Sequence, residues 1–307
     1  MNSFLHTPVL LEEVKEVFSN LKDGYFIDCT LGYGGHSEAI LKINPKIKLI
    51  GIDQDEEAIA YSKERLKDFE DRVKIVKGRF SKAIEQFLNL EVKAILADIG
   101  VSSLQLDKKS RGFSFDSEVL DMRMDKSQTL SAYDVVNFYP KKRLEFIFKE
   151  YGELRNYEKI AKIIIDQRRK KEIKSAKELS ELLLKHLSKK KRIHPATLVF
   201  QAIRIEVNDE LKELKTLLDK LEECRLKGAK VAIITFHSLE DKIVKSRFKK
   251  WAKSCICPDN IYRCECGNSN ELGKILTKKP LVAKESEIKK NPRSRSAKMR
   301  VFQFKEE

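Results

Sequence analysis

The segment formed by residues 25–53 constrains the fold more than any other part of this 307-residue chain. Residues 25–30 form a short apolar run suited to a buried strand, and the turn that follows has glycine at positions 32, 34 and 35. A helix can begin at Ser37, and residues 48–53 predict a second strand that ends on Asp53. This order of strand, glycine-rich turn, helix and strand is typical of α/β folds that hold a nucleoside-like ligand.

The turn and Asp53 together indicate an adenosine ligand. Glycine lets the ligand lie against the backbone, and a carboxylate about 20 residues further on can accept hydrogen bonds from both ribose hydroxyls. A dinucleotide fingerprint has glycine at its first, third and sixth places, whereas Gly32 and Gly34 are followed here by Ser37. S-adenosylmethionine has no phosphate and therefore fits better than NAD. An ordinary strand-to-helix connection with spare glycines is the alternative.

The alternation continues along the chain. Residues 73–76 and 92–99 predict two more strands, and residues 56–69 and 81–90 predict helices, so we expect a parallel, doubly wound sheet. Ligands of such sheets bind at the carboxyl ends of the strands. Five residues fall at those ends, namely Asp28, Gly32, Asp53, Phe80 and Asp98. Their convergence predicts a site at this edge, although Phe80 taken alone would fit a core position.

The pattern then changes to helices without strands. Residues 140–151, 158–169, 175–187 and 195–221 have helical periodicity, and residues 231–236 resume the sheet and end at His237. Residues 299–304 predict a closing strand. We therefore expect an α/β, Rossmann-like sheet made by residues 1–106 and 222–307, with an all-helical domain of residues 107–221 inserted.

The positive charge of the chain is concentrated in two segments. The net charge is +15, and residues 138–192 hold 18 lysines and arginines against 8 acidic residues. Residues 240–300 hold 17 against 7, so the rest of the chain is net acidic. Two basic segments indicate a polyanion that is contacted by two surfaces, such as a nucleic acid. A solvated lysine-rich surface with ion pairs is the alternative.

The sequence also bears on compartment and metal binding. No apolar run approaches the roughly 20 residues of a membrane helix, residues 1–16 lack a secretory leader, and the six cysteines suit a reducing, cytoplasmic setting. Cys29 and Cys224 are interpreted as core residues. Cys255, Cys257, Cys264 and Cys266 could bind tetrahedral zinc, but their pairs are one residue shorter than Cys-x-x-Cys. Zinc and four reduced thiols both stay open, and no metal ligand is assigned.

Eight blocks of sequence carry a family resemblance along nearly the whole chain. They are residues 7–14, 28–37, 98–103 with Gln105, 111–115, 120–124, 192–197 with 200–204, 236–241 and 291–296. In this order they resemble the bacterial 16S ribosomal RNA cytosine-N4 methyltransferases, the RsmH (MraW) family. The resemblance implies an rRNA (cytosine-N4-)-methyltransferase with a class I methyltransferase fold and an inserted helical domain that recognises RNA.

The same resemblance implies the ligands. The methyl donor would be S-adenosylmethionine, and the acceptor a decoding-centre cytidine of 16S rRNA in the small ribosomal subunit. The implied donor contacts are Gly34, Gly35, His36, Asp53, Phe80, Asp98 and Gln105. The protein would be cytoplasmic, would not bind membranes, and could form a homodimer.

The chemistry singles out Asp98 as the catalytic candidate. The cytosine amine donates its lone pair into the ring, so a hydrogen-bond acceptor that draws this pair out would favour attack. Asp98 lies at a strand end where it could accept from the amine, and His237 is the reserve candidate. The rival classes are a nicotinamide-dependent oxidoreductase, a non-catalytic RNA-binding protein, and a DNA cytosine-N4 methyltransferase. The last class has a Ser/Asp-Pro-Pro-Tyr/Phe tetrapeptide where this chain has residues 98–101.

Overall fold

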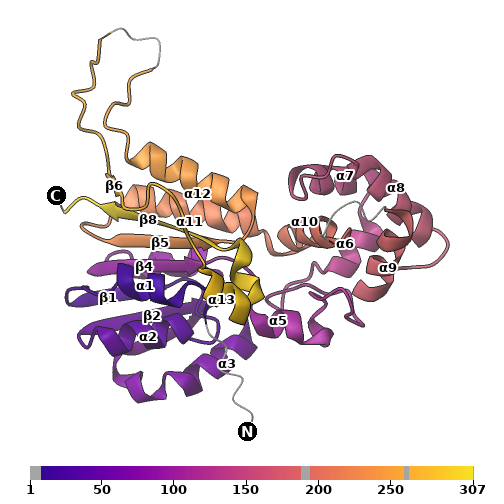
Figure 1. The fold of residues 1–307 in the computed structure, drawn as a ribbon, viewed down its shortest axis with the longest axis horizontal. Coiled ribbons are helices and arrows are strands. Elements are labelled where there is room, and N and C mark those ends of the chain that lie inside the picture. Colours follow the sequence, from indigo (N-terminus) through magenta and orange to yellow (C-terminus); the bar gives the residue numbers. More distant parts are fainter. Residues whose placement is uncertain (1–7, 188–193, 259–262, 307) are drawn as a thin grey trace. The chain divides into compact units, whose positions relative to one another are not determined.

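The computed structural model describes residues 8–187, 194–258 and 263–306. The chain forms two compact units (Figure 1): a sheet unit, Met1–Gly100 with Glu213–Glu307, and a helical unit, Val101–Lys212. The boundaries thus fall at 100/101 and 212/213, whereas the sequence led us to expect 106/107 and 221/222.

The sheet unit is built on one sheet with the order β3-β2-β1-β4-β5-β8-β6, and β7 pairs with β8. Strands β1 to β5 are parallel, and β8 runs antiparallel to β5, β6 and β7. The α/β, doubly wound sheet predicted from sequence is therefore confirmed. The strand order reverses between β1 and β4, which is where such sheets bind ligands. The bounds are β1 (Gly24–Asp28), β2 (Ile47–Asp53), β3 (Val73–Lys77), β4 (Val92–Asp98), β5 (Lys230–Thr235), β6 (Gly273–Ile275), β7 (Leu281–Val282) and β8 (Lys298–Phe304).

Helices cover both faces of this sheet. Successive strand residues point to opposite sides, and both sides carry apolar residues that the helices bury. Ile27 and Ile95 belong to one buried cluster, whereas their neighbours Phe26 and Leu96 belong to another. The α-helices are α1 (Leu11–Val17), α2 (Gly35–Ile43), α3 (Glu56–Arg65), α4 (Phe80–Ala83), α11 (Glu210–Cys224), α12 (Ser238–Trp251) and α13 (Glu285–Lys290). The 3-10 helices are η1 (Lys67–Arg72), η2 (Ile84–Phe87) and η4 (Pro292–Ser296).

Helix α11 explains why the boundary differs from the expected one. Its leucines recur every three or four residues, so they form one apolar face. Leu214, Leu217, Leu218 and Leu221 are fully buried in the cluster that contains Ile95 of β4. Most of the helix therefore belongs to the sheet. It is separated from α10 at Asp209, whose left-handed backbone (φ 54°) ends the preceding helix, so residues 195–221 form two helices and not one.

The helical unit has its own core and, among the residues described, no strand. Its helices are α5 (Ser103–Asp107), α6 (Ala132–Phe138), α7 (Lys141–Glu150), α8 (Tyr157–Arg168), α9 (Ala176–His186) and α10 (Thr197–Asn208), with the 3-10 helix η3 (Lys109–Arg111). Leu144, Ile164, Leu183 and Ile203, from four of these helices, are fully buried together.

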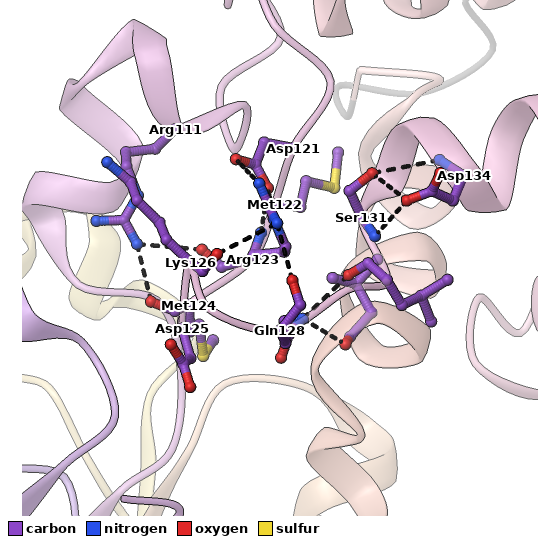
Figure 2. A network of polar contacts seen from close by, with 12 residues as sticks. Arg111, Asp121, Met122, Arg123, Met124, Asp125, Lys126, Gln128, Ser131 and Asp134 are labelled. Carbon is purple, nitrogen blue, oxygen red and sulfur yellow. Dashed lines mark hydrogen bonds and ion pairs between the residues drawn. The ribbon is translucent and has the colours of Figure 1, made fainter. Parts of the chain in front are cut away.

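A network of polar contacts supports residues 111–134 (Figure 2), in addition to the burial of Phe113, Leu120 and Met122 in the core of the helical unit. The side chain of Arg111 is fully buried and donates hydrogen bonds from Nη2 to the carbonyls of Arg123 and Met124. Arg123 in turn binds the Asp121 carboxylate through Nε (2.6 Å) and Nη2 (3.2 Å). Asn208 of α10 pairs with the backbone of Met124 and of Met122. This irregular segment is therefore an ordered part of the helical unit.

In the described part of the chain, no helix combines the length and the apolar character that crossing a membrane requires.

Candidate functional site

Three carboxylates end adjacent parallel strands of the sheet unit. Asp53, Asp28 and Asp98 are the last residues of β2, β1 and β4, which lie next to one another in that order. The carboxyl ends of parallel strands meet at one edge, so the three side chains are brought to the same rim. The registers Asp28↔Gly51 and Asp28↔Leu96 agree with the strand ends that were predicted from sequence.

The turn after β1 is fixed to the two neighbouring strands by its backbone. The amide of Cys29 donates to the carbonyl of Leu96 on β4 (2.8 Å), and the amide of Leu31 donates to that of Ile52 on β2 (2.9 Å). Gly34 then adopts a left-handed conformation (φ 72°), and α2 begins at the next residue. A residue with a Cβ would be strained there, so glycine is required for the chain to enter α2.

Asp53 ties this turn to the end of β2. Its Oδ2 accepts a hydrogen bond from the amide of Gly32 (2.7 Å), and its Oδ1 accepts one from the amide of Asp55 (2.8 Å). Burial raises the pKa of the Asp53 carboxyl to about 6, even though both backbone hydrogen bonds act to lower it. Each carboxylate oxygen has a further lone pair, so Asp53 can still accept hydrogen bonds from a ligand.

His36 and Asp98 face each other at the same edge. The Nε2 atom of His36, in the first turn of α2, lies 3.6 Å from Oδ2 of Asp98. The backbone of Asp98 is fixed by a 2.7 Å hydrogen bond from its amide to the Thr30 hydroxyl. Among the described residues, the two ring nitrogens of His36 have no hydrogen-bond partner. The buried Oδ1 atom of Asp98 has none either. Buried polar atoms are seldom left without a partner, so these atoms indicate a ligand position.

Asp28 is engaged within the protein. Its Oδ2 accepts a hydrogen bond from the Ser37 hydroxyl (2.6 Å), and its Oδ1 accepts one from the amide of Thr30 (3.1 Å). Burial raises the pKa of the Asp28 carboxyl, and the Ser37 hydrogen bond opposes this shift. Asp28 therefore joins β1 to the first turn of α2. This contact gives a structural role to Ser37, which departs from a dinucleotide fingerprint and was expected to begin the helix, whereas α2 begins at Gly35.

The other sequence-predicted contacts occupy different surroundings. Phe80 is half-buried at the start of α4 and packs on the core, two residues beyond Gly78, whose amide binds the carbonyl of Asp53 (2.8 Å). At Gly35 a Cβ would lie 2.5 Å from Cγ of Pro8, so this glycine allows the chain before α1 to pass closely. Gln105 belongs to the helical unit, where it is buried and its amide oxygen accepts from the amide of Ser102 (3.0 Å).

The sequence of the whole chain matches one family. The sequence model of the MraW methylase family aligns with residues 3–305. The chain belongs to the MraW methylase family. S-adenosylmethionine is thus its methyl donor, and its Rossmann-like sheet with a helical unit is the class I methyltransferase architecture that the sequence analysis expected.

Curated relatives of this MraW family member are similar over their full length. The chain is 63% identical over 302 residues to the "Ribosomal RNA small subunit methyltransferase H" of a Nitratiruptor species, covering 98% of this chain and 99% of the relative. The protein of the same name from Aliarcobacter butzleri is 58% identical and covers 97% and 98%. That of Campylobacter jejuni (serotype O:23/36) is 55% identical and covers 97% of each.

One further residue at this edge of the MraW fold escaped the sequence analysis. Glu240 of α12 is fully buried, and its Oε2 accepts hydrogen bonds from the amides of Phe236 (2.8 Å) and His237 (3.2 Å). Its Oε1 lies 3.0 Å from Nε2 of His237. Glu240 thus fixes the backbone of the reserve candidate His237 and lies beside its ring, whose nitrogens, like those of His36, have no hydrogen-bond partner among the described residues. The signal was the Glu that follows His237 by three residues, a spacing typical of helix N-terminal capping.

Proposed function

We propose that this protein transfers the methyl group of S-adenosylmethionine to the N4 amine of a decoding-centre cytidine in 16S rRNA. The names of the relatives point to ribosomal RNA of the small subunit as the substrate. The single observation that carries the chemistry is the Oδ1 atom of Asp98, which is buried at the strand edge without a hydrogen-bond partner among the described residues. The amine of cytosine is the kind of donor that such an atom would accept from.

The residues around the β1 turn fit the methyl donor. Asp53 would accept hydrogen bonds from the ribose hydroxyls, and the turn at Gly34 would let the donor lie against the backbone. Phe80, which follows the next strand, would pack against the adenine. The ring nitrogens of His36 have no hydrogen-bond partner among the described residues, and polar atoms of the bound methyl donor would supply one. When bound, the donor supplies an electrophilic methyl group, so the protein need only position it.

Asp98 would act on the acceptor. The lone pair of the exocyclic amine is conjugated with the ring, and attack on the methyl group requires that the pair leave conjugation. A carboxylate that accepts an N–H hydrogen bond stabilises the positive charge that develops on nitrogen. Asp98 Oδ1 could then take the amine proton after the new N–C bond forms. His36, 3.6 Å from Oδ2, would orient the carboxylate so that Oδ1 faces the amine.

The helical unit supplies features suited to RNA. The side chains of Lys142 on α7 and of Lys159 and Lys162 on α8 are exposed. Phe138 and Phe146 are exposed by 62% and 42%, and the Arg143 guanidinium lies 4.8 Å from the ring centroid of Phe146. Cations interleaved with exposed aromatic rings suit single-stranded nucleic acid, because the rings stack on unpaired bases.

Transfer of labelled methyl from S-adenosylmethionine to small ribosomal subunits that lack the modification tests this function. We expect label in N4-methylcytidine after digestion to nucleosides. Label in 5-methylcytidine, in a 2′-O-methyl ribose or in DNA would contradict the proposal. A thermal shift with S-adenosylhomocysteine but not with NAD should accompany transfer, and protection by NAD alone would favour an oxidoreductase.

A further inference from the structure

The segment that joins α12 to β6 forms no apolar core of its own among its described residues, 252–258 and 263–272. It leaves the sheet unit after Trp251, extends away from it and returns at Leu272 (Figure 1). None of the described residues between 252 and 272 is buried. Two contacts close its base: the amide of Leu272 binds the carbonyl of Trp251 (2.7 Å), and that of Asn270 binds Ser254 (3.0 Å). So short an excursion cannot be ordered by apolar burial, and such pieces are usually held by a disulfide or a metal.

Four cysteine sulfurs converge just beyond this base. Cys255 Sγ lies 3.6 Å from Cys264 Sγ and 3.8 Å from Cys266 Sγ, and Cys264 Sγ lies 3.6 Å from Cys266 Sγ. The Sγ of Cys257 completes the group, in which all four sulfurs lie within 4.8 Å of one another. No other part of the fold forces the four thiols together, since they come from a segment without buried residues among those described.

The separations of 3.6–3.8 Å among Cys255, Cys264 and Cys266 match those of a single tetrahedral metal site. Zn–S bonds are about 2.3 Å long, so the sulfurs at the corners of a ZnS₄ tetrahedron lie about 3.8 Å apart. A disulfide would bring sulfurs to about 2.05 Å, and only in pairs. A multinuclear iron–sulfur cluster would hold its cysteines farther apart, because several iron atoms lie between them.

The backbone around the cysteines supports the thiolate form that metals bind. In each Cys-x-Cys pair, the amide of the middle residue points at the second cysteine of the other pair. The amide of Ile256 lies 3.4 Å from Cys266 Sγ, and that of Glu265 lies 3.4 Å from Cys257 Sγ. Amides that donate to sulfur stabilise its negative charge and orient the ligand. The shorter spacing is no obstacle, because alternate residues of an extended chain point to the same side.

From this convergence we propose that Cys255, Cys257, Cys264 and Cys266 bind one structural zinc ion that holds the segment between α12 and β6 in its fold. The site is closed, with four protein ligands and no open position for a substrate. Binding releases the thiol protons to solvent. The metal lies outside the donor site, so it takes no part in methyl transfer itself.

Metal analysis of the full chain, purified without chelator, tests the proposal without donor or RNA. We expect about one zinc ion per chain in the wild type, and at least tenfold less in a Cys257→Ser/Cys264→Ser variant, which removes one ligand from each pair. Cys224→Ser is the matched control. The prediction that Cys224 is a core residue was wrong, because its thiol lies exposed at the end of α11, where it should not affect zinc. No metal in the wild type, iron in place of zinc, or two disulfides by mass spectrometry would each overturn the proposal.

A second measurement keeps the proposal testable if the double variant is unstable. Replacement of zinc by cobalt should give the thiolate-to-metal charge-transfer and visible bands of a tetrahedral sulfur site, and their absence would contradict it. Trypsin should cut at the exposed Lys253 and Arg263 much faster once a chelator has removed the metal. Affinity for S-adenosylhomocysteine should stay unchanged in both states. Loss of donor binding on zinc removal would show that the ion serves the donor site and not this segment alone.

Discussion

The Nε2 atom of His36 lies 3.6 Å from the Oδ2 atom of Asp98, and this contact joins the first turn of α2 to the end of β4. This separation is longer than a hydrogen bond, so the two side chains are neighbours but do not form a hydrogen bond in this structure. The second oxygen of Asp98 is buried and without a partner among the described residues. Catalytic hydrogen bonds often shorten only when the substrates bind, which makes the pair a reasonable centre for the transfer.

The first prediction concerns Asp98→Asn, which removes the charge and the ability to take a proton but keeps the shape. We expect the single-turnover rate at saturating donor to fall at least tenfold, or about 1.4 kcal/mol of barrier. His237→Gln is the comparison variant, and it should have the smaller effect because Asp98, and not this histidine, is proposed to accept the hydrogen bond from the amine. Full recovery of the Asp98→Asn rate at saturating donor would restrict Asp98 to donor binding.

The second prediction concerns Asp53→Ala. Two ribose hydrogen bonds to a charged acceptor would be lost, at about 1.5–3 kcal/mol each. Titration calorimetry with S-adenosylhomocysteine measures the change. Because Asp53 also accepts from the amide of Gly32, Asp53→Asn is the companion variant that keeps an oxygen for this turn. Unchanged affinity in a variant that unfolds at the wild-type temperature would remove Asp53 from the donor site.

A pH dependence follows from the pKa of Asp53, which burial raises to about 6 from an ordinary value of 3.8. The carboxyl group binds its proton more tightly in the folded protein, so its contribution to stability is greatest below pH 3.8 and is lost as the pH rises through 6. The affinity for the methyl donor depends on pH in the opposite direction, because the ribose hydroxyls donate hydrogen bonds to the ionised carboxylate of Asp53. We expect affinity for S-adenosylhomocysteine to weaken as the pH falls below about 6.

Calorimetry at pH 6 in buffers of different ionisation enthalpy would detect the proton that binding releases from Asp53. Asp53→Asn cannot release it, so its binding should show a smaller proton release. Equal proton release in the wild type and in this variant would contradict the assignment.

The carboxyl edge could be predicted from sequence because the rule behind it is local. A strand pattern fixes where Asp53 and Asp98 end their strands, and parallel pairing then brings the two ends together. The side-chain contacts of these residues could not be predicted from the sequence pattern. Whether Asp28 is open or engaged depends on Ser37, and the position of His237 depends on Glu240, which reaches back from α12. Such contacts are decided by three-dimensional packing.

The domain boundary illustrates the same limit. Residues 195–221 have continuous helical periodicity, and a helix pattern does not reveal which core its apolar face joins. The left-handed Asp209 divides the segment, and Leu214 and Leu218 on the far side pack under the sheet. The convergence of four cysteines was undecidable from spacing for a similar reason, because spacing alone does not determine where the sulfurs point.

The fourth prediction concerns stability and the polar segment of the helical unit. Gly112 has a left-handed backbone (φ 78°), and a Cβ there would lie 2.5 Å from the amide nitrogen of Asp121. Backbone strain alone costs about 1–2 kcal/mol, and the clash with backbone adds to it. We expect Gly112→Ala to lower the free energy of unfolding by at least about 2 kcal/mol in chemical denaturation.

Gly228→Ala is the matched control for this substitution. Its φ is also positive (70°), but a Cβ there would meet only the side chain of Glu306, at 3.3 Å. A flexible side chain can move away, so the control should cost only the backbone strain. Equal losses in the two variants would mean that the packing of Gly112 against Asp121 contributes nothing.

The last prediction concerns the salt dependence of RNA binding, because each phosphate that a protein neutralises steepens the fall of log affinity with log salt by about 0.7–0.9. Two triple variants separate the basic segments: Lys142, Lys159 and Lys162 to Gln in the helical unit, and Lys278, Lys289 and Lys290 to Gln in the sheet unit. All six side chains are exposed. Arg300 is left in place, since it is buried and bound to Asp241 (2.6 Å), so its loss would damage the fold.

Each triple variant should lower the salt slope by at least about 1 while affinity for S-adenosylhomocysteine stays unchanged. The charge-matched control changes Lys22, Lys46 and Lys67 to Gln, because these exposed lysines lie outside both basic segments. If the loss were only one of net charge, the control would reduce the slope as much as the other two variants. A slope that responds to one segment alone would assign RNA binding to that segment, and a slope indifferent to both would make the charge a solubility feature.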